Sequence, residues 1–121
     1  SWKLNIDEIN YIIDRLLQEN YLNEERFALT FAGGKFRIKH WGRKKIVQKL
    51  KEKRVSEYCI KKALEEIDDK DYIITLHRLI EKKHGSLKDK DSFTKKKKTA
   101  TYIYGKGFEI DLIWEHLNNC Y

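Results

Sequence analysis

The side chains most often used in catalysis or metal binding are few and scattered in this sequence. Two cysteines, Cys59 and Cys120, lie far apart and form no CxxC pair, so neither a disulfide framework nor a zinc site is predicted. His77 and His84 are seven residues apart and can share a helix face, but no HExxH-type arrangement is present. No glycine-rich phosphate loop and no nucleophile with a base at a recognisable spacing occurs. We therefore expect that the protein is not an enzyme and binds no metal or cofactor. The histidines are expected to be ordinary surface or core residues, and Cys59 a small core residue.

The charged side chains are instead strongly segregated along the chain. Residues 35–54 hold ten basic side chains and one acidic, residues 82–106 hold nine and two, and the segments around them are net negative. Exposed ion pairs contribute only about 0 to 1 kcal/mol, so stability does not explain this pattern. Clustered lysine and arginine attract polyanions, either nucleic-acid phosphates or an acidic protein face. The alternative is a run of solvated charge, especially for the four consecutive lysines at 95–98.

Two basic patches are therefore predicted to bind a partner or nucleic acid. Arg26 is a further candidate, which either pairs with an acid inside the fold or projects outward. The first patch is Lys35, Arg37, Lys39, Arg43, Lys44 and Lys45, and the second is Lys95, Lys96, Lys97 and Lys98.

The elements that must position these residues are all predicted to be helices. Proline is absent, there are only six glycines, and apolar residues recur every three or four positions, as in amphipathic helices. Tyr21-Leu22 is expected to be a connector, Asn23 and Ser56 to be N-caps, and Gly33-Gly34 to cause a kink or a close backbone approach. About seven helices are expected, near residues 6–20, 23–36, 42–54, 56–67, 70–85, 91–104 and 109–118.

Two further expectations concern where the protein acts. No window reaches the roughly 18 consecutive apolar residues that a membrane span needs, and the first residues do not form a signal peptide. We expect a cytoplasmic protein that does not contact a membrane, and a monomer.

The sequence also contains an internal repeat. A shift of 53 residues aligns Leu50 with Ile103 and Ile60 with Ile113, and apolar positions match through two helices and their turn. Stacked repeats require such a recurring buried face. The alternation of basic and acidic segments supports the repeat independently, because each basic segment falls around the middle helix of a three-helix unit. An elongated array is predicted, with the end of an incomplete first unit at residues 1–22, a second unit at 23–68 and a third at 69–121.

Several motifs resemble those of the RecX family of recombination regulators. The segment 21–28, YLNEERFA, resembles the family signature YLDDxRFA. It is followed by WGRKKI at 41–46, LKEKRV at 50–55 and YGKGF at 104–108, which are similar to later family elements. The motif positions expected to be structural are Tyr21, Leu22, Phe27, Ala28, Gly42, Ile46, Leu50, Gly107 and Phe108.

The resemblance implies a curved array of three-helix repeats, related to helix-turn-helix geometry. It also implies a partner, the RecA filament on single-stranded DNA, whose ATPase, strand-exchange and coprotease activities family members restrain in DNA repair and recombination. One departure concerns Arg54, which stands where the family and this chain's own second copy, at Gly107, have glycine. A glycine there indicates a left-handed residue, so Arg54 must adopt that conformation at a cost of about 1 to 2 kcal/mol or reshape the turn.

Two other binding functions remain at this stage, and one of them is a helical scaffold for some other protein. The other is a helix-turn-helix module that binds single- or double-stranded DNA without a recombinase, although the lysine-rich helices suit backbone or protein contact better than reading of base edges.

The aromatic and apolar residues of the motifs also have expected positions. Tyr21, Leu22 and Phe27 are expected in the core, whereas Trp41 is either a core plug or an exposed ring that stacks on a partner.

Overall fold

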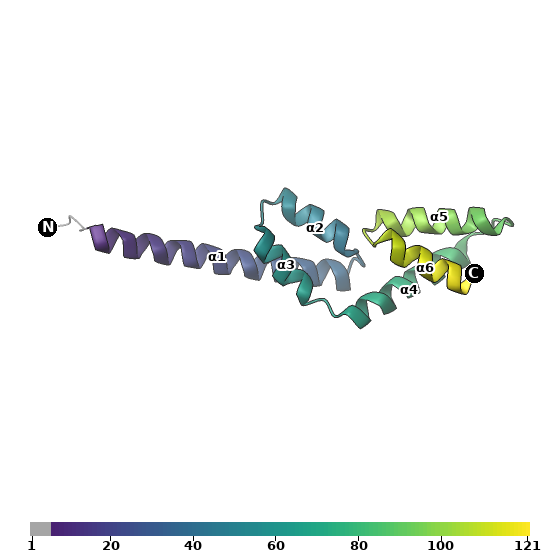
Figure 1. Cartoon of the computed structure of the whole chain (residues 1–121), viewed down its shortest axis with the longest axis horizontal. Helices are drawn as coiled ribbons and strands as arrows, with labels where there is room; N and C mark the ends of the chain where they lie inside the picture. Colours follow the sequence, from purple (N-terminus) through teal and green to yellow (C-terminus); the bar gives the residue numbers. More distant parts are fainter. Residues whose placement is uncertain (1–5) are drawn as a thin grey trace.

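The computed structural model describes residues 6–121, which form six helices and no strand. These are α1 (Ile6–Arg37), α2 (Arg43–Glu52), α3 (Glu57–Glu65), α4 (Asp69–Ser86), α5 (Ser92–Gly105) and α6 (Ile110–Cys120). The all-α class predicted from the sequence is confirmed. Figure 1 shows an elongated molecule in which α2 and α3 lie against the C-terminal half of α1, and α4 to α6 pack together at the opposite end.

The prediction of about seven helices was wrong, because residues 6–37 form one continuous helix. No glycine or proline lies between Asn20 and Asn23, and asparagine in a helix interior costs less than about 1 kcal/mol relative to alanine. Asn23 is therefore not an N-cap. The carboxylate of Glu24, in the same motif, instead accepts a hydrogen bond from the backbone N–H of Ser56, so it helps to hold the start of α3 against α1.

The helix α1 also continues through Gly33 and Gly34. A Cβ at Gly33 would meet only the flexible side chain of Arg37 among its three nearest atoms, and a Cβ at Gly34 would meet nothing. The helix is uninterrupted at both glycines, and Gly33 is buried.

The predicted cap at Ser56 is confirmed, and two further helix starts have side-chain caps that were not predicted. The hydroxyl of Ser56 accepts from Cys59 N at 3.3 Å, and the carboxylates of Asp68 and Asp91 cap α4 and α5 in the same way. Cys59 is fully buried, as predicted. The core runs along the molecule from Ala28 on α1 to Leu117 on α6.

The two turns aligned by the 53-residue shift share one backbone hydrogen bond and a left-handed central residue. Arg54 N donates to Lys51 O and Gly107 N donates to Tyr104 O, both at 2.9 Å. Both central residues have positive φ, 62° at Arg54 and 100° at Gly107. Of the two alternatives for Arg54, the structure shows the left-handed conformation.

The N-terminal half of α1 projects away from the rest of the molecule (Figure 1). Its apolar side chains, including Ile9, Ile13 and Leu16, are each at least 42% exposed. The expectation that Tyr21, Leu22 and Phe27 are core residues was wrong, since their exposed fractions are 40%, 57% and 45%. They lie on this helix before or at the edge of the region that α3 covers.

Candidate interaction surface

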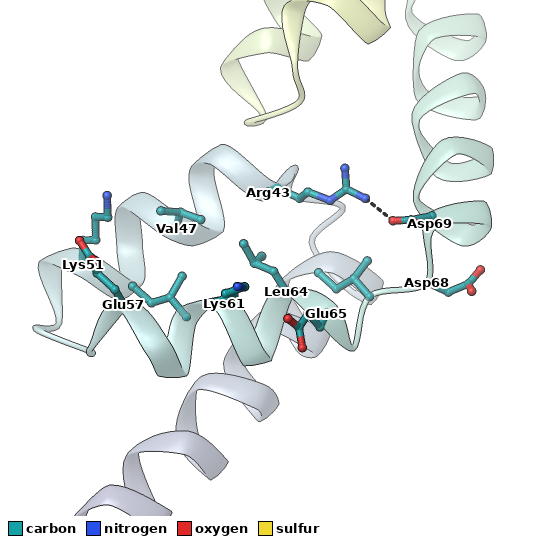
Figure 2. A pocket seen from close by; sticks show the side chains of 11 residues that line it. Arg43, Val47, Lys51, Glu57, Lys61, Leu64, Glu65, Asp68 and Asp69 are labelled. Carbon is teal, nitrogen blue, oxygen red and sulfur yellow. Dashed lines mark hydrogen bonds and ion pairs between the residues drawn. The ribbon is translucent and has the colours of Figure 1, made fainter.

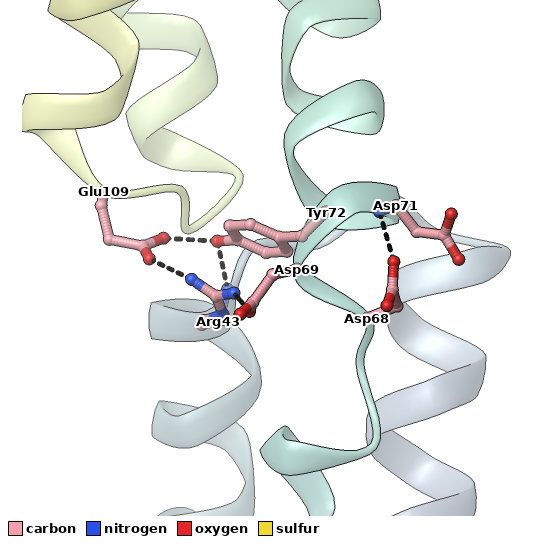
Figure 3. Close-up of polar contacts among 6 residues, drawn as sticks. All are labelled: Arg43, Asp68, Asp69, Asp71, Tyr72 and Glu109. Atoms are coloured by element: carbon pink, nitrogen blue, oxygen red, sulfur yellow. Dashed lines mark hydrogen bonds and ion pairs between the residues drawn. The ribbon is translucent and has the colours of Figure 1, made fainter.

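Arg43, predicted in the first basic patch, lies in an internal polar network. Its guanidinium bonds Glu109 at 3.0 Å and Asp69 at 2.8 Å, and stacks 3.8 Å from the centre of the Tyr72 ring. Figure 3 shows these side chains converging from α2, α4 and the start of α6. The interpretation of Arg43 as a free cation for a partner therefore has to be corrected: its charge joins the two halves of the molecule.

Tyr72 is the centre of this network. Its fully buried ring lies between Phe36 and Phe108, with centroid distances of 5.7 and 5.1 Å. The phenol accepts from Arg43 N at 2.9 Å and donates to Glu109. Burial, and then the hydrogen bond to Glu109, raise the pKa of Tyr72, so the phenol stays protonated and keeps donating.

Sequence analysis missed Tyr72, Glu109 and Asp69 as partners of Arg43. Asp69 and Glu109 are 26 and 66 positions away from it along the chain, beyond any helical spacing. The only signal was the pair of glycines at 42 and 107, which lie at the same junction.

The remaining basic residues of the first patch lie on the surface. Lys39, Arg37 and Lys44 are exposed, whereas Lys35 and Lys45 are half-buried beside aromatic rings. Arg26 is exposed on α1. Among residues 6–121, no ion pair to a carboxylate is recorded for any of these six side chains.

Trp41 lies between the two positions expected for it, the core and the exposed surface. It is half-buried and packs against the core, and its ring meets Phe31 edge-on at 6.3 Å. The ammonium groups of Lys35 and Lys45 lie 4.9 and 4.5 Å from the ring centre.

The second patch occupies the first half of α5. Lys95 and Lys96 are half-buried, and Lys97 and Lys98 are exposed. Lys98 is bonded to Asp89 at 2.7 Å, and that ammonium lowers the pKa of the Asp89 carboxyl. Lys97 lines an open hollow with Lys83 and Tyr102, whose ring centre is 4.4 Å from the Lys83 ammonium. Three of the four predicted lysines are thus without a recorded carboxylate partner in the described part of the chain.

A larger groove runs between α2 and α3. Figure 2 shows Val47 and Leu64 in its floor, with Lys51 and Glu57 at one end and Asp69 at the other. Its rim mixes both signs of charge, and Arg43 at its edge is already paired with Asp69. The groove therefore offers an apolar surface without a preference for anions.

Two of the four histidines, on α4 and α6, stack on each other. His77 and His116 stack at 3.8 Å, and burial, together with the neighbouring His116, lowers the pKa of His77. No set of three or more histidine, cysteine or acidic residues suited to a metal ion occurs within 6–121. None of the six helices is long and apolar enough to span a membrane.

The other motif residues lie inside the fold. Ala28, Ile46, Leu50 and Phe108 are fully buried, and Gly42 and Gly107 are buried where the start of α2 meets the turn between α5 and α6.

Comparisons with known proteins agree with the motifs. A family model described as the second three-helix domain of RecX matches residues 23–64, and one described as the third matches residues 71–117. A regulatory protein RecX of Pelodictyon phaeoclathratiforme is 30% identical over 111 residues, which are 92% of this chain and 65% of that protein. The regulatory protein RecX of Clostridium perfringens is 35% identical over 107 residues, 87% of this chain and 50% of the relative.

The chain spans between half and two thirds of the length of these two curated relatives. No solved structure matches it. With two successive domain models matched and relatives aligned over about nine tenths of its residues, the chain belongs to the RecX family.

Proposed function

We propose that this chain binds the RecA nucleoprotein filament and modulates its recombinase activities, without chemistry of its own. Membership of a family of regulatory proteins supports the role, and the motif resemblance names RecA as the partner. The observation that carries the proposal is the pair of lysine patches on α1–α2 and α5, whose ammonium groups mostly lack carboxylate partners in the described residues.

The shape of the molecule supports contact with a polymer. The patches lie on the two halves of an elongated chain (Figure 1). The Arg43 network (Figure 3) and the backbone hydrogen bonds from residues 42 and 44 to residues 106 and 107 connect those halves. Two separated weak sites on one rigid body gain affinity when they engage neighbouring subunits together, because the second contact forms at a high effective concentration. Each patch alone should therefore bind a filament much more weakly than both together.

We also propose that residues 23–68 and 69–121 act as two successive units, with residues 1–22 belonging to the end of a preceding one. The packing of α1 with α3, and of α4 with α5 and α6, supports the division between the first two. The exposed apolar stripe of residues 6–17 fits a helix that packs against a further element.

Cosedimentation with RecA filaments tests the proposed partner. Filaments formed on single-stranded DNA should carry the chain into the pellet, whereas RecA without nucleotide and DNA should carry much less. Lys39→Glu/Lys44→Glu should reduce pelleting at least about tenfold, since steering and contact both depend on the patch charge. The matched control is Lys61→Glu/Lys82→Glu, the same charge change at exposed positions on α3 and α4. Equal pelleting of both double variants would reject the first patch, and no pelleting of the wild-type chain would reject RecA as the partner.

A further inference from the structure

A compact group of aromatic rings lies at the surface where α1 meets α2. Phe27 and Phe31 are one helical turn apart with centroids at 5.8 Å, and Phe31 meets Trp41 at 6.3 Å. Phe27 is 45% exposed, and Phe31 and Trp41 are half-buried. The backs of Phe31 and Trp41 pack on the core, which fixes them in place while part of each ring remains accessible.

Three lysines gather over these rings. The ammonium of Lys35 lies 5.4 Å from the centre of Phe31 and 4.9 Å from that of Trp41. Lys45 lies 4.5 Å from the Trp41 centre, and Lys53 lies 5.8 Å from that of Phe31. Phe31 and Trp41 thus each have two ammonium groups nearby, from Lys35 on α1, Lys45 on α2 and Lys53 just after α2. We call Phe31, Trp41, Lys35, Lys45 and Lys53 the lysine–aromatic cluster.

The charge of this cluster is not neutralised within the described residues. No ion pair is recorded for any of its three lysines, while Glu52 is paired with Lys49 and the Glu24 carboxylate accepts from Ser56. An ammonium over an exposed ring gains only about 0.5 to 1 kcal/mol. Because the three ammonium groups repel one another and gain so little from the rings, they can readily turn to bind an anion.

The ligand that uses both parts of the cluster must be anionic and planar. A nucleotide of a single strand has a phosphate for the lysines and a base whose face can replace an ammonium over a ring. A duplex keeps its bases stacked inside, and an acidic peptide offers carboxylates but no planar group for the rings. We propose that the lysine–aromatic cluster is a stacking site for single-stranded nucleic acid, with a base on Phe31 or Trp41 and Lys35, Lys45 and Lys53 on the flanking phosphates. This goes beyond the proposed function, because such binding needs no recombinase.

Trp41 provides the signal that tests this inference. In the Trp2→Phe/Trp114→Phe background, Trp41 is the sole tryptophan. An oligothymidylate of about twelve nucleotides should quench its fluorescence saturably at low salt. It should also bind about tenfold tighter or more than an abasic oligonucleotide of equal length, because both have the same phosphates and only one has bases.

Two variants separate stacking from simple charge attraction. Phe31→Leu should remove most of the preference for oligothymidylate over the abasic strand while leaving abasic binding unchanged. Lys35→Gln/Lys45→Gln/Lys53→Gln should lower the affinity for both oligothymidylate and the abasic strand, and it should make binding less dependent on salt concentration. Its matched control, Lys61→Gln/Lys62→Gln/Lys82→Gln, loses the same charge elsewhere and should bind like the parent. Circular dichroism establishes that each variant is folded, and if Phe31→Leu is not, the lysine variants decide.

Several results would overturn the inference. These are equal affinity for the abasic strand and for oligothymidylate, absence of Trp41 quenching, binding of polyglutamate as tight as that of oligothymidylate, or equal losses in the two triple-lysine variants.

Discussion

Gly42 and Gly107 meet backbone to backbone and join the two halves of the molecule. Gly42 N donates to Lys106 O at 2.8 Å, and Lys44 N donates to Gly107 O at 2.9 Å. A Cβ at Gly42 would collide with the Gly107 carbonyl and with Phe108 N, which are backbone atoms that cannot swing away. The relative placement of the two basic patches therefore depends on two residues that have no side chain.

Gly42→Ala should destabilise the chain by about 2 kcal/mol or more, because it introduces overpacking against backbone. The backbone conformation at Gly42, φ −76° and ψ 169°, is open to alanine, so the loss is due to the contact alone. Urea unfolding gives the free energy. Gly34→Ala is the matched control, and it should stabilise by about 0.5 to 1 kcal/mol because it lies within α1 with free space around it. Equal effects of the two substitutions would exclude the close approach.

Substitutions at the two equivalent left-handed positions should have opposite effects. Arg54→Gly relieves a strain of about 1 to 2 kcal/mol but costs about 0.5 to 1 kcal/mol through unfolded-state entropy, so a gain of up to about 1.5 kcal/mol is expected. Gly107→Ala should cost about 2 kcal/mol or more, because φ is 100° and a Cβ would lie 2.6 Å from Lys45 N. Thermal unfolding measures both, and a loss on Arg54→Gly would contradict the strain.

The two carboxylates that hold Arg43 should differ in their contribution to stability. The Glu109 side chain is 23% exposed and also accepts from Tyr72, so Glu109→Gln should cost about 1 to 3 kcal/mol. The Asp69 side chain is 91% exposed, and Asp69→Asn should cost no more than about 1 kcal/mol despite its shorter distance to Arg43. The midpoints of urea unfolding would show this difference. A larger loss of stability for Asp69→Asn than for Glu109→Gln would contradict the conclusion that Glu109 is the main partner of Arg43.

Stability should fall as the pH is lowered through about 6.5. Burial and the neighbouring His116 lower the pKa of His77, so the unfolded chain binds this proton before the folded chain does. The contribution is complete above the unfolded pKa and is lost as the pH drops toward the folded value. The melting temperature measured between pH 7.5 and 5.5 should fall less steeply in His77→Gln. An unchanged slope would mean that His77 does not titrate in this way. The pH dependence that is left in His77→Gln is expected from His84, whose pKa is also lowered.

Helix positions followed well from the sequence wherever the determinant is local. Ser56 caps its own helix, and the apolar spacing that aligns Leu50 with Ile103 places both in the core. The predicted helix start at residues 21–25 was wrong because asparagine followed by two glutamates favours a helix start, although nothing nearby stops the preceding helix. In the structure the helix continues through these residues, and Glu24 accepts a hydrogen bond from Ser56 N, 32 positions away along the chain.

The candidate surface was predictable in composition but not in detail. Charge segregation identified the two patches, yet Arg43 looks the same in sequence as its neighbours Lys44 and Lys45. Its internal role depends on Asp69 and Glu109, which only the packing of the two halves brings near. The lysines over Trp41 likewise come from both sides of a turn, so no helical spacing relates them.

The measurement that tests the central claim most directly is the ATPase rate of RecA on single-stranded DNA with increasing amounts of this chain. The wild-type chain should lower the rate in a saturable manner. Lys39→Glu/Lys44→Glu and Lys96→Glu/Lys97→Glu should each require at least about tenfold more protein for the same effect, and their combination should have almost none. A wild-type chain that leaves the rate unchanged, or a combined variant that inhibits as well as the wild type, would contradict a role for the two lysine patches on a RecA filament.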